Sequence, residues 1–494
     1  MLDVYEGTYS SLLVNVAAVV AVSLAFGGMV DAGSGSRMLE SPASMSVVAE
    51  NVAMQTVLTV PTRQLSGDLR SMVPTAADGV RGTSSRGMSV GSSPVLPIVS
   101  PLVPSRADLG TAALGTTTGA RLLSELTRLG MAGISEFLSA YPSKIDALLA
   151  SPPAAATVSG WWRGLGNSDQ TAWLSAAPRV VGNLEGIPVS ERSVANLRYL
   201  SETDADIRQR LASGHSRGEQ TGLTQELSIL RQVKLAVAEG AGHAARYLMQ
   251  LDPADGGRAV VVIGNPDTAD FVTYLVPGMN YGVQEQLVNW SATAEALYAE
   301  QKRVLRERSD PTLPAKQVAT IAWIGYETPD LFSVGGLDRA ENGADQLERA
   351  INGLREVRGD DQPFLSIIGH SYGSVLSLVA LARGTLSVDT FTMVGSPGSA
   401  SQSASDLNVN GGEVFVGEAD WDPAVNSGFF GSDPGASSYG AHRLGVSGNR
   451  DALSGKWLKA SFGHNEYFTP GSESLHNMAL IGTGYAKQVT GRSE

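Results

Sequence analysis

The segment that most constrains the fold runs from Phe364 to Leu376. An apolar strand pattern leads into Gly-His-Ser-Tyr-Gly around Ser371, and residues that favour a helix follow at once. This order predicts a nucleophile elbow, a sharp turn that lifts a serine hydroxyl clear of a sheet. Gly369 and Gly373 fit such a turn because strand and helix pack too closely there for a β-carbon. We therefore expect Ser371 to have a strained backbone at a strand end.

Two other stretches also match Gly-x-Ser-x-Gly, at 87–91 and 214–218. The first lies in a Ser/Gly/Pro-rich stretch with no strand pattern before it. The second follows a helix-like segment and runs into polar residues. Because the turn needs a strand before the serine and a helix after it, only Ser371 has the required context.

Composition narrows the class of protein. At 494 residues, with 43% hydrophobic and 17% charged residues, the chain is long enough for two or three globular domains. The formal net charge is -13 and no dense Lys/Arg stripe is present, which argues against a nucleic-acid partner. Cysteine is absent, so disulfides, thiolate catalysis and cysteine-bound zinc are excluded.

An uncharged apolar run at 11–30 predicts a membrane-spanning helix, since about 20 apolar residues cross the hydrocarbon core of a bilayer. Asp3 and Glu6 precede this run without any Lys or Arg, and no clear cleavage site follows it. Both features disfavour a cleaved signal peptide. A buried or partner-binding helix is the remaining alternative.

The N-terminal segment 1–31 leads into residues 32–117, which are rich in Ser, Pro, Gly and Thr and which we interpret as a linker or stalk. Two signals disagree on the side of the membrane. Arg37 and Arg63 follow the apolar run and favour a cytoplasmic C-terminal part. The stalk-like composition instead favours an extracytoplasmic one. The sequence predicts a single-pass, membrane-anchored protein and leaves its orientation and oligomeric state open.

The rest of the chain divides by its apolar spacing. Over 118–252 leucines recur at helical intervals, which predicts a helical region. Over 253–487 short β-rich runs alternate with longer helical ones. Strands are expected at 258–264, 271–276, 318–324, 364–368, 390–394 and 414–416. This alternation predicts an α/β domain, a mostly parallel sheet with helices on both faces that binds ligands at the carboxyl ends of its strands.

A serine hydroxyl becomes a strong nucleophile only when a histidine takes its proton and a carboxylate holds that histidine. Three histidines follow Ser371. We favour His464, because it sits in a loop beyond the last expected strand from which an imidazole can reach back over the sheet. His442 opens a short strand pattern, and His476 falls inside a predicted C-terminal helix, so packing or surface roles suit them better.

The acid is expected just after the strand at 414–416. Asp422 is preferred because the proline that follows it fixes the turn, and Asp420 is the alternative. Glu418 is a weaker candidate. Acyl transfer also needs two donors for an oxyanion. The predicted donors are the backbone N–H groups of Tyr372, after the nucleophile, and of Met279, in the Pro-Gly-Met loop that follows the strand at 271–276.

With these residues in place, the chain resembles a group of largely uncharacterised actinobacterial α/β-hydrolases whose elbow reads Gly-His-Ser-Tyr-Gly-Ser. The resemblance covers residues 155–486. It rests on Trp161-Trp162 and on the segments 182–188, 276–279, 323–326, 369–374, 395–398 and 463–464. It implies an α/β-hydrolase core preceded by a helical segment, a triad of Ser371, Asp422 and His464, and neither cofactor nor metal. It implies no particular substrate.

The sequence thus predicts a serine hydrolase that cleaves an acyl bond through an acyl-enzyme. An ester or thioester of a small or lipid-like acyl group is the favoured substrate, because a membrane-anchored enzyme would meet such compounds. Two alternatives stay open. One is an envelope-associated binding or scaffold protein with an inactive hydrolase fold. The other is an acyltransferase that uses the same triad.

Overall fold

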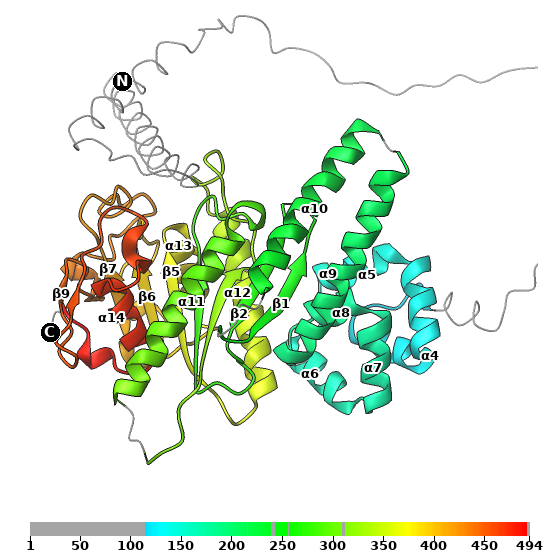
Figure 1. Ribbon diagram of the computed structural model, residues 1–494, viewed down its shortest axis with the longest axis horizontal. Helices are drawn as coiled ribbons and strands as arrows, with labels where there is room; N and C mark the ends of the chain where they lie inside the picture. The colour runs from blue at the N-terminus through cyan, green and yellow to red at the C-terminus, as the bar shows by residue number, and fades with distance from the viewer. Residues whose placement is uncertain (1–113, 215, 239–242, 255, 309–311, 492–494) are drawn as a thin grey trace, which may run out of the picture. The chain divides into compact units, whose positions relative to one another are not determined.

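The structure is a computed structural model that describes residues 114–214, 216–238, 243–254, 256–308 and 312–491 (Figure 1). The apolar run predicted at 11–30 lies outside these residues, as does nearly all of the linker predicted at 32–117. Within the described ranges, no helix is both long enough and apolar enough to cross a bilayer. The membrane anchor and its orientation therefore stay predictions.

The first described part of the chain is helical. Its helices are α4 (Gly119–Ala140), α5 (Pro142–Ala150), α6 (Ala155–Gly164), α7 (Asn167–Ala176), α8 (Pro178–Asn183), α9 (Val189–Ala212) and α10 (Arg217–Val237). Residues of α4 to α9 share a hydrophobic core, in which the indoles of Trp161 and Trp173 both donate to Thr127 Oγ1, at 3.3 and 3.0 Å. These tryptophans are packing residues of the helical region.

A mostly parallel eight-stranded sheet follows, in the order β1-β2-β4-β3-β5-β6-β7-β8. Its strands are β1 (Arg246–Asp252), β2 (Arg258–Ile263), β3 (Phe271–Val276), β4 (Val318–Ile324), β5 (Phe364–His370), β6 (Thr390–Val394), β7 (Val414–Gly417) and β8 (His442–Arg443). β2 runs antiparallel to both β1 and β4, and the other pairings are parallel. β9 (Asn449–Arg450) and β10 (Trp457–Leu458) form a separate hairpin. The predicted α/β class is confirmed.

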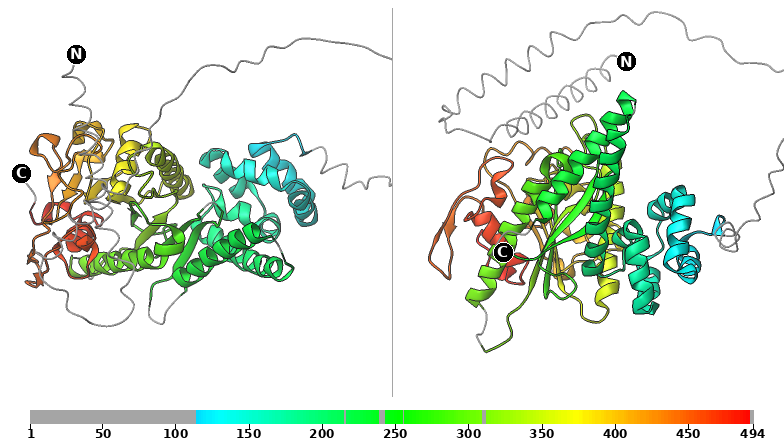
Figure 2. Two further views of the ribbon diagram at one scale, coloured as in Figure 1. Left: turned by 90° about the horizontal axis from the view of Figure 1, so that it is seen from above. Right: turned by 45° about the vertical axis from the view of Figure 1, so that its right-hand side comes forward.

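Helices cover both faces of the sheet (Figure 2). α10, α11 (Val283–Arg308) and α14 (Glu473–Ile481) pack on one face, and α12 (Asp338–Arg358) and α13 (Tyr372–Ala382) pack on the other. Strand β2 shows why both faces are apolar: Val260 and Val262 join one core while Val261 and Ile263 join the other. Side chains alternate along a strand, so a sheet buried on both faces needs a continuous apolar run.

The strand order changes direction at β3. The crossover through α11 leads to β4 on one side of β3, and the crossover through α12 leads to β5 on the other side. Loops that follow β3 and β5 therefore diverge, and such a point leaves a crevice at the carboxyl ends of the strands. Met279 follows β3 and Ser371 follows β5, so both predicted site residues lie at this crevice.

Strand β1 is the one strand that the sequence analysis assigned to the helical region at 118–252. It forms an edge of the sheet, and its outward backbone groups are bonded by side chains of α8 and α9. Ser193 Oγ accepts from the Leu248 N–H at 3.0 Å, and Asn196 Nδ2 donates to the Leu248 carbonyl at 2.9 Å. Asn183 bonds both backbone groups of Leu251. An exposed edge invites pairing with other chains, and these contacts satisfy it.

We expect Asn196→Leu to lower the free energy of unfolding by about 1–3 kcal/mol, because it leaves a buried backbone carbonyl of β1 without its donor. Urea unfolding of the full chain measures this loss. Asn289→Leu on the exposed surface of α11 is the matched control and should cost less than about 0.5 kcal/mol. Equal losses in the two variants would contradict the edge-capping role.

Candidate active site

Ser371 stands at the turn between β5 and α13, as the sequence predicts for an elbow. Its φ of 55° and ψ of -131° place it in a region that non-glycine residues rarely adopt. Its backbone N–H donates to the Val394 carbonyl at the end of β6, at 3.0 Å. A β-carbon on Gly373 would lie 2.3 Å from the Val276 carbonyl oxygen, so only glycine lets the helix pack this closely on β3. The neighbouring elements thus hold the strained conformation.

Asp422 and His464 form a buried pair. The Nδ1 of His464 donates to Oδ1 of Asp422 at 2.8 Å, and both side chains are almost completely enclosed. The pair rests against Gly395, the residue after Val394. A β-carbon there would lie 2.8 Å from Oδ2 of Asp422 and 3.1 Å from two atoms of the His464 ring. The structure therefore brings the acid and the histidine to the strand whose end also binds the Ser371 amide.

Tyr467 holds the second oxygen of the acid, a contact that the sequence analysis missed. Its hydroxyl donates to Oδ2 of Asp422 at 2.6 Å and accepts from the Ala419 N–H at 2.9 Å. Burial alone would raise the pKa of the Asp422 carboxyl, but the hydrogen bonds from His464 and Tyr467 outweigh burial and lower this pKa below its ordinary value. Asp422 is thus ionised and fixed in orientation at neutral pH.

His370, the residue before Ser371, forms a hydrogen bond with the loop that carries His464. Its Nε2 donates to the backbone carbonyl of His464 at 2.7 Å, and the two imidazole rings lie 4.8 Å apart. The rings of Trp290 and Phe468 also pack near it. Burial, assisted by nearby His464, lowers the pKa of His370 to about 3, so this ring is neutral at ordinary pH and donates through Nε2.

The loop after β3 touches the nucleophile. A β-carbon on Gly278 would lie 2.6 Å from the Ser371 β-carbon, and the Met279 side chain lines the same pocket as Ser371. The hydroxyl of Tyr326 fixes this loop by donating to the Pro277 carbonyl at 2.8 Å. Helix α13 begins at Tyr372, so its N-terminal amides and the positive end of its dipole face the region beside Ser371.

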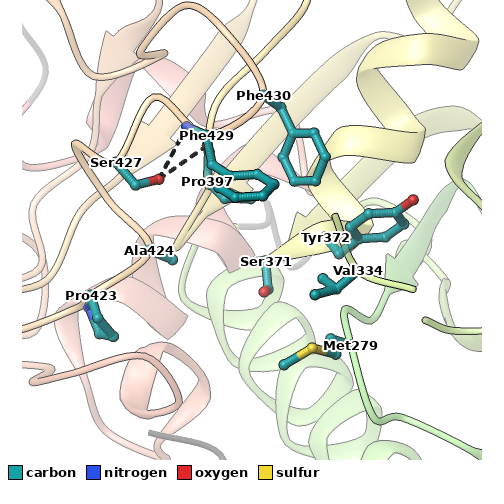
Figure 3. Close-up of a pocket in the computed structure, with 10 residues that line it drawn as sticks. All are labelled: Met279, Val334, Ser371, Tyr372, Pro397, Pro423, Ala424, Ser427, Phe429 and Phe430. Carbon is teal, nitrogen blue, oxygen red and sulfur yellow. Dashed lines mark hydrogen bonds between the residues drawn. The ribbon is translucent and has the colours of Figure 1, made fainter. Parts of the chain in front are cut away.

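An apolar pocket opens over Ser371 (Figure 3). Ser371 lies in its middle, with Met279 and Val334 on one side and Ala424 on the other, and Phe430 lies across from them. The remaining lining residues are Tyr372, Pro397, Pro423, Ser427 and Phe429. Because almost all of these side chains are apolar, the space beside the serine suits a hydrocarbon group better than a charged one.

The other two candidate acids and the candidate histidine His442 have different surroundings. Asp420 is exposed, and its backbone carbonyl accepts from Gly463 at 2.8 Å. Glu418 forms an ion pair with Arg443. His442 packs its ring 5.5 Å from that of Phe415.

The third histidine belongs to a different cluster. His476 lies on α14, where its Nδ1 is 2.7 Å from Glu300 and 2.9 Å from Arg303 of α11. No group of three or more His, Asp or Glu side chains within the described ranges has the arrangement of a metal site.

This fold is that of an α/β hydrolase. The sequence profile of a family described as "Alpha/beta hydrolase" matches residues 252–432. An uncharacterized protein of Mycobacterium bovis is 33% identical over 223 residues, which cover 43% of this chain and 80% of that protein. The chain belongs to this family of α/β hydrolases, which has mycobacterial members.

Similarity is also found to other proteins. Uncharacterized proteins of two Mycobacterium tuberculosis strains are 27% identical over 394 residues, which cover 70% of this chain. The match spans 58% of the length of those relatives. Among solved structures, an esterase of Pyrobaculum calidifontis has 14% identity over 57% of this chain and 97% of its own, with a TM-score of 0.31.

The low pKa of His370 predicts that acid destabilises the protein. In the unfolded chain this histidine regains its ordinary pKa of 6.5, so the unfolded state binds a proton that the folded state excludes. Stability should fall as pH drops from 6.5 towards 3, and His370 should account for a loss of about 2 kcal/mol between about pH 8 and about pH 5. Urea unfolding at both pH values measures it, and His370→Asn should lose correspondingly less over that range. Equal losses in both proteins would contradict the assignment.

Tyr467→Phe should lower kcat by about tenfold and leave KM unchanged, because it removes one hydrogen bond from the ionised acid while the pocket stays intact. Steady-state hydrolysis of a short p-nitrophenyl ester measures both constants. Tyr274→Phe removes another buried tyrosine hydroxyl, one that donates to a carbonyl of α12, and it should keep the wild-type kcat. A change in KM alone would refute the role of Tyr467 as a positioning residue.

Proposed function

We propose that this chain is a serine hydrolase that cleaves an ester through an acyl-enzyme. The observation that carries the proposal is the buried Asp422–His464 pair, 2.8 Å apart, seated beside an elbow whose serine has φ of 55°. A carboxylate held against an imidazole, next to a strained serine at a strand end, suits nucleophilic acyl transfer. The membership in an α/β hydrolase family supports the same reading.

The reaction follows from the roles of these groups. Ser371 Oγ attacks the ester carbonyl while Nε2 of His464 takes its proton, and Asp422 stabilises the imidazolium that forms. The N–H groups of Tyr372 and Met279 bind the oxyanion of the tetrahedral intermediate. His464 then protonates the departing alkoxide, which leaves an acyl group on Ser371. Water activated by His464 releases the acid and restores the serine.

The lining of the pocket supports an ester of a hydrophobic acid as the substrate class. Val334, Ala424 and Phe430 surround the serine with hydrocarbon, and among the residues that the structure describes no Lys or Arg lines the pocket to bind an anionic acyl group. Burial of apolar substrate surface contributes about 25 cal/mol per Å². We therefore expect kcat/KM to rise with the acyl chain length of the ester until the pocket is filled.

A fluorophosphonate probe tests the nucleophile directly. The full-length wild type should be labelled, and Ser371→Ala should lose both labelling and at least about 10³-fold in esterase activity. Ser427→Ala is the matched control, because it removes a different serine of the same pocket and should keep labelling. An unlabelled wild type would favour the binding or scaffold alternative, whereas products with added alcohol acceptors would identify an acyltransferase.

A further inference from the structure

Large apolar side chains point into solvent on the loops that surround the site. Phe332 is 95% exposed and Leu331 beside it is exposed as well, in the loop between β4 and α12. Trp421 is 89% exposed in the acid loop, and Phe462 is 53% exposed in the histidine loop. We call these four residues the apolar rim. Monomeric proteins rarely expose such a group of side chains without a use for it.

The rim belongs to the mouth of the pocket. Val334, two residues after Phe332, lines the pocket on one side of Ser371, and Pro423, two residues after Trp421, lines it on the other side (Figure 3). The segment with Phe462 is joined to the acid loop, because the Gly463 N–H donates to the Asp420 carbonyl at 2.8 Å. Two of the loops that carry the rim therefore also line the pocket over Ser371.

Hydrogen bonds within the loops and an unusual backbone conformation accompany the exposure of the rim. The Asp330 carboxylate accepts from the N–H groups of Phe332 and Ser333 and from the Ser333 hydroxyl, at 2.7–3.0 Å, and this turn directs Phe332 outward. The hydroxyl of Tyr372 braces the same loop by donating to the Gly336 carbonyl at 2.7 Å. Trp421 has a φ of 63°, a conformation that costs a bulky residue free energy.

Charge indicates what kind of surface fits the rim. The ionisable residues near it in the chain are mainly acidic, namely Glu327, Asp330, Asp338, Asp420 and Glu466. Of the two basic residues nearest to it, Arg339 is paired with Glu327, and Lys459 is exposed three residues before Phe462. These carboxylates would be repelled by an anionic surface. A surface without net charge avoids this repulsion and still provides hydrocarbon for aromatic side chains.

We propose that the apolar rim inserts into the surface of a lipid aggregate without net charge, from which an ester-bearing lipid enters the pocket over Ser371. The delivery of a substrate rests on the proposed function, whereas docking of the rim does not. Aromatic side chains that lie at a lipid–water interface gain apolar burial while their loops remain in water. A lipid surface also explains why exposed apolar side chains lie on the three loops that carry Val334, Asp422 and His464.

The native tryptophans provide a test that is specific to the rim. Of the seven tryptophans in the sequence, Trp421 belongs to the rim and Trp457 is exposed elsewhere. Trp457 lies on the hairpin of β9 and β10, which is anchored through Asp451 to Arg303 of α11. The apolar run at 11–30 contains no tryptophan.

Full-length protein is mixed with vesicles of phosphatidylcholine brominated on its acyl chains, which quenches only tryptophans that enter the bilayer. The wild type should be quenched, Trp421→Phe should lose that quenching, and Trp457→Phe should keep it. Phe332→Ser should raise the lipid concentration for half-maximal quenching by about tenfold, because one inserted aromatic side chain is lost. Brominated phosphatidylglycerol should bind more weakly than the phosphatidylcholine.

Ser371→Ala should be quenched like the wild type, since docking does not need the nucleophile. A chain that docks but resists the fluorophosphonate probe would refute the hydrolase and leave the rim intact. Wild-type protein that shows no quenching, or quenching that persists in Trp421→Phe, would overturn the lipid-docking proposal. The rim would then serve another occupant, such as residues 11–30 or a protein partner.

Discussion

Close backbone packing at the ends of β3, β5 and β6 is the constraint on which the site depends. The amide of Ser371 binds the end of β6, and Gly395 at that end leaves room for the Asp422–His464 pair. A strained serine survives there because the helix that follows it is buried along most of its length. Burial of its apolar side chains stabilises the turn by more than the strain of one residue costs.

Much of the fold could be predicted because its signals are local. Continuous apolar runs marked the strands from β2 to β7. The elbow was marked by a strand pattern before Ser371 and a helix pattern after it. Strand β1 escaped prediction because polar residues interrupt its sequence Arg-Tyr-Leu-Met-Gln-Leu-Asp. Its place at the edge depends on Ser193 and Asn196, which stand far from it in the chain and give no local signal.

In the site, as in the fold, local sequence signals allowed a prediction and contacts between distant residues did not. The sequence predicted which two loops carry an acid and a histidine of the site, but the spacing of two between Asp420 and Asp422 could not separate these aspartates. The structure turns Asp422 towards His464 and leaves Asp420 exposed. The supporting roles of His370 and Tyr467 depend on contacts across 94 and 45 positions of the chain. Their only sequence signal is their nearness to Ser371 and His464.

The acid loop and the histidine loop each combine a buried polar group with an exposed aromatic one. Asp422 follows Trp421 directly, and His464 lies two residues after Phe462. A lipid surface that engaged these aromatic side chains would therefore act beside the buried pair. That pair is hydrogen-bonded, and its second carboxylate oxygen is held by Tyr467. Under the proposed mechanism, docking would change how often substrate reaches Ser371 rather than how fast the bound ester reacts, because protein hydrogen bonds alone hold the Asp422–His464 pair.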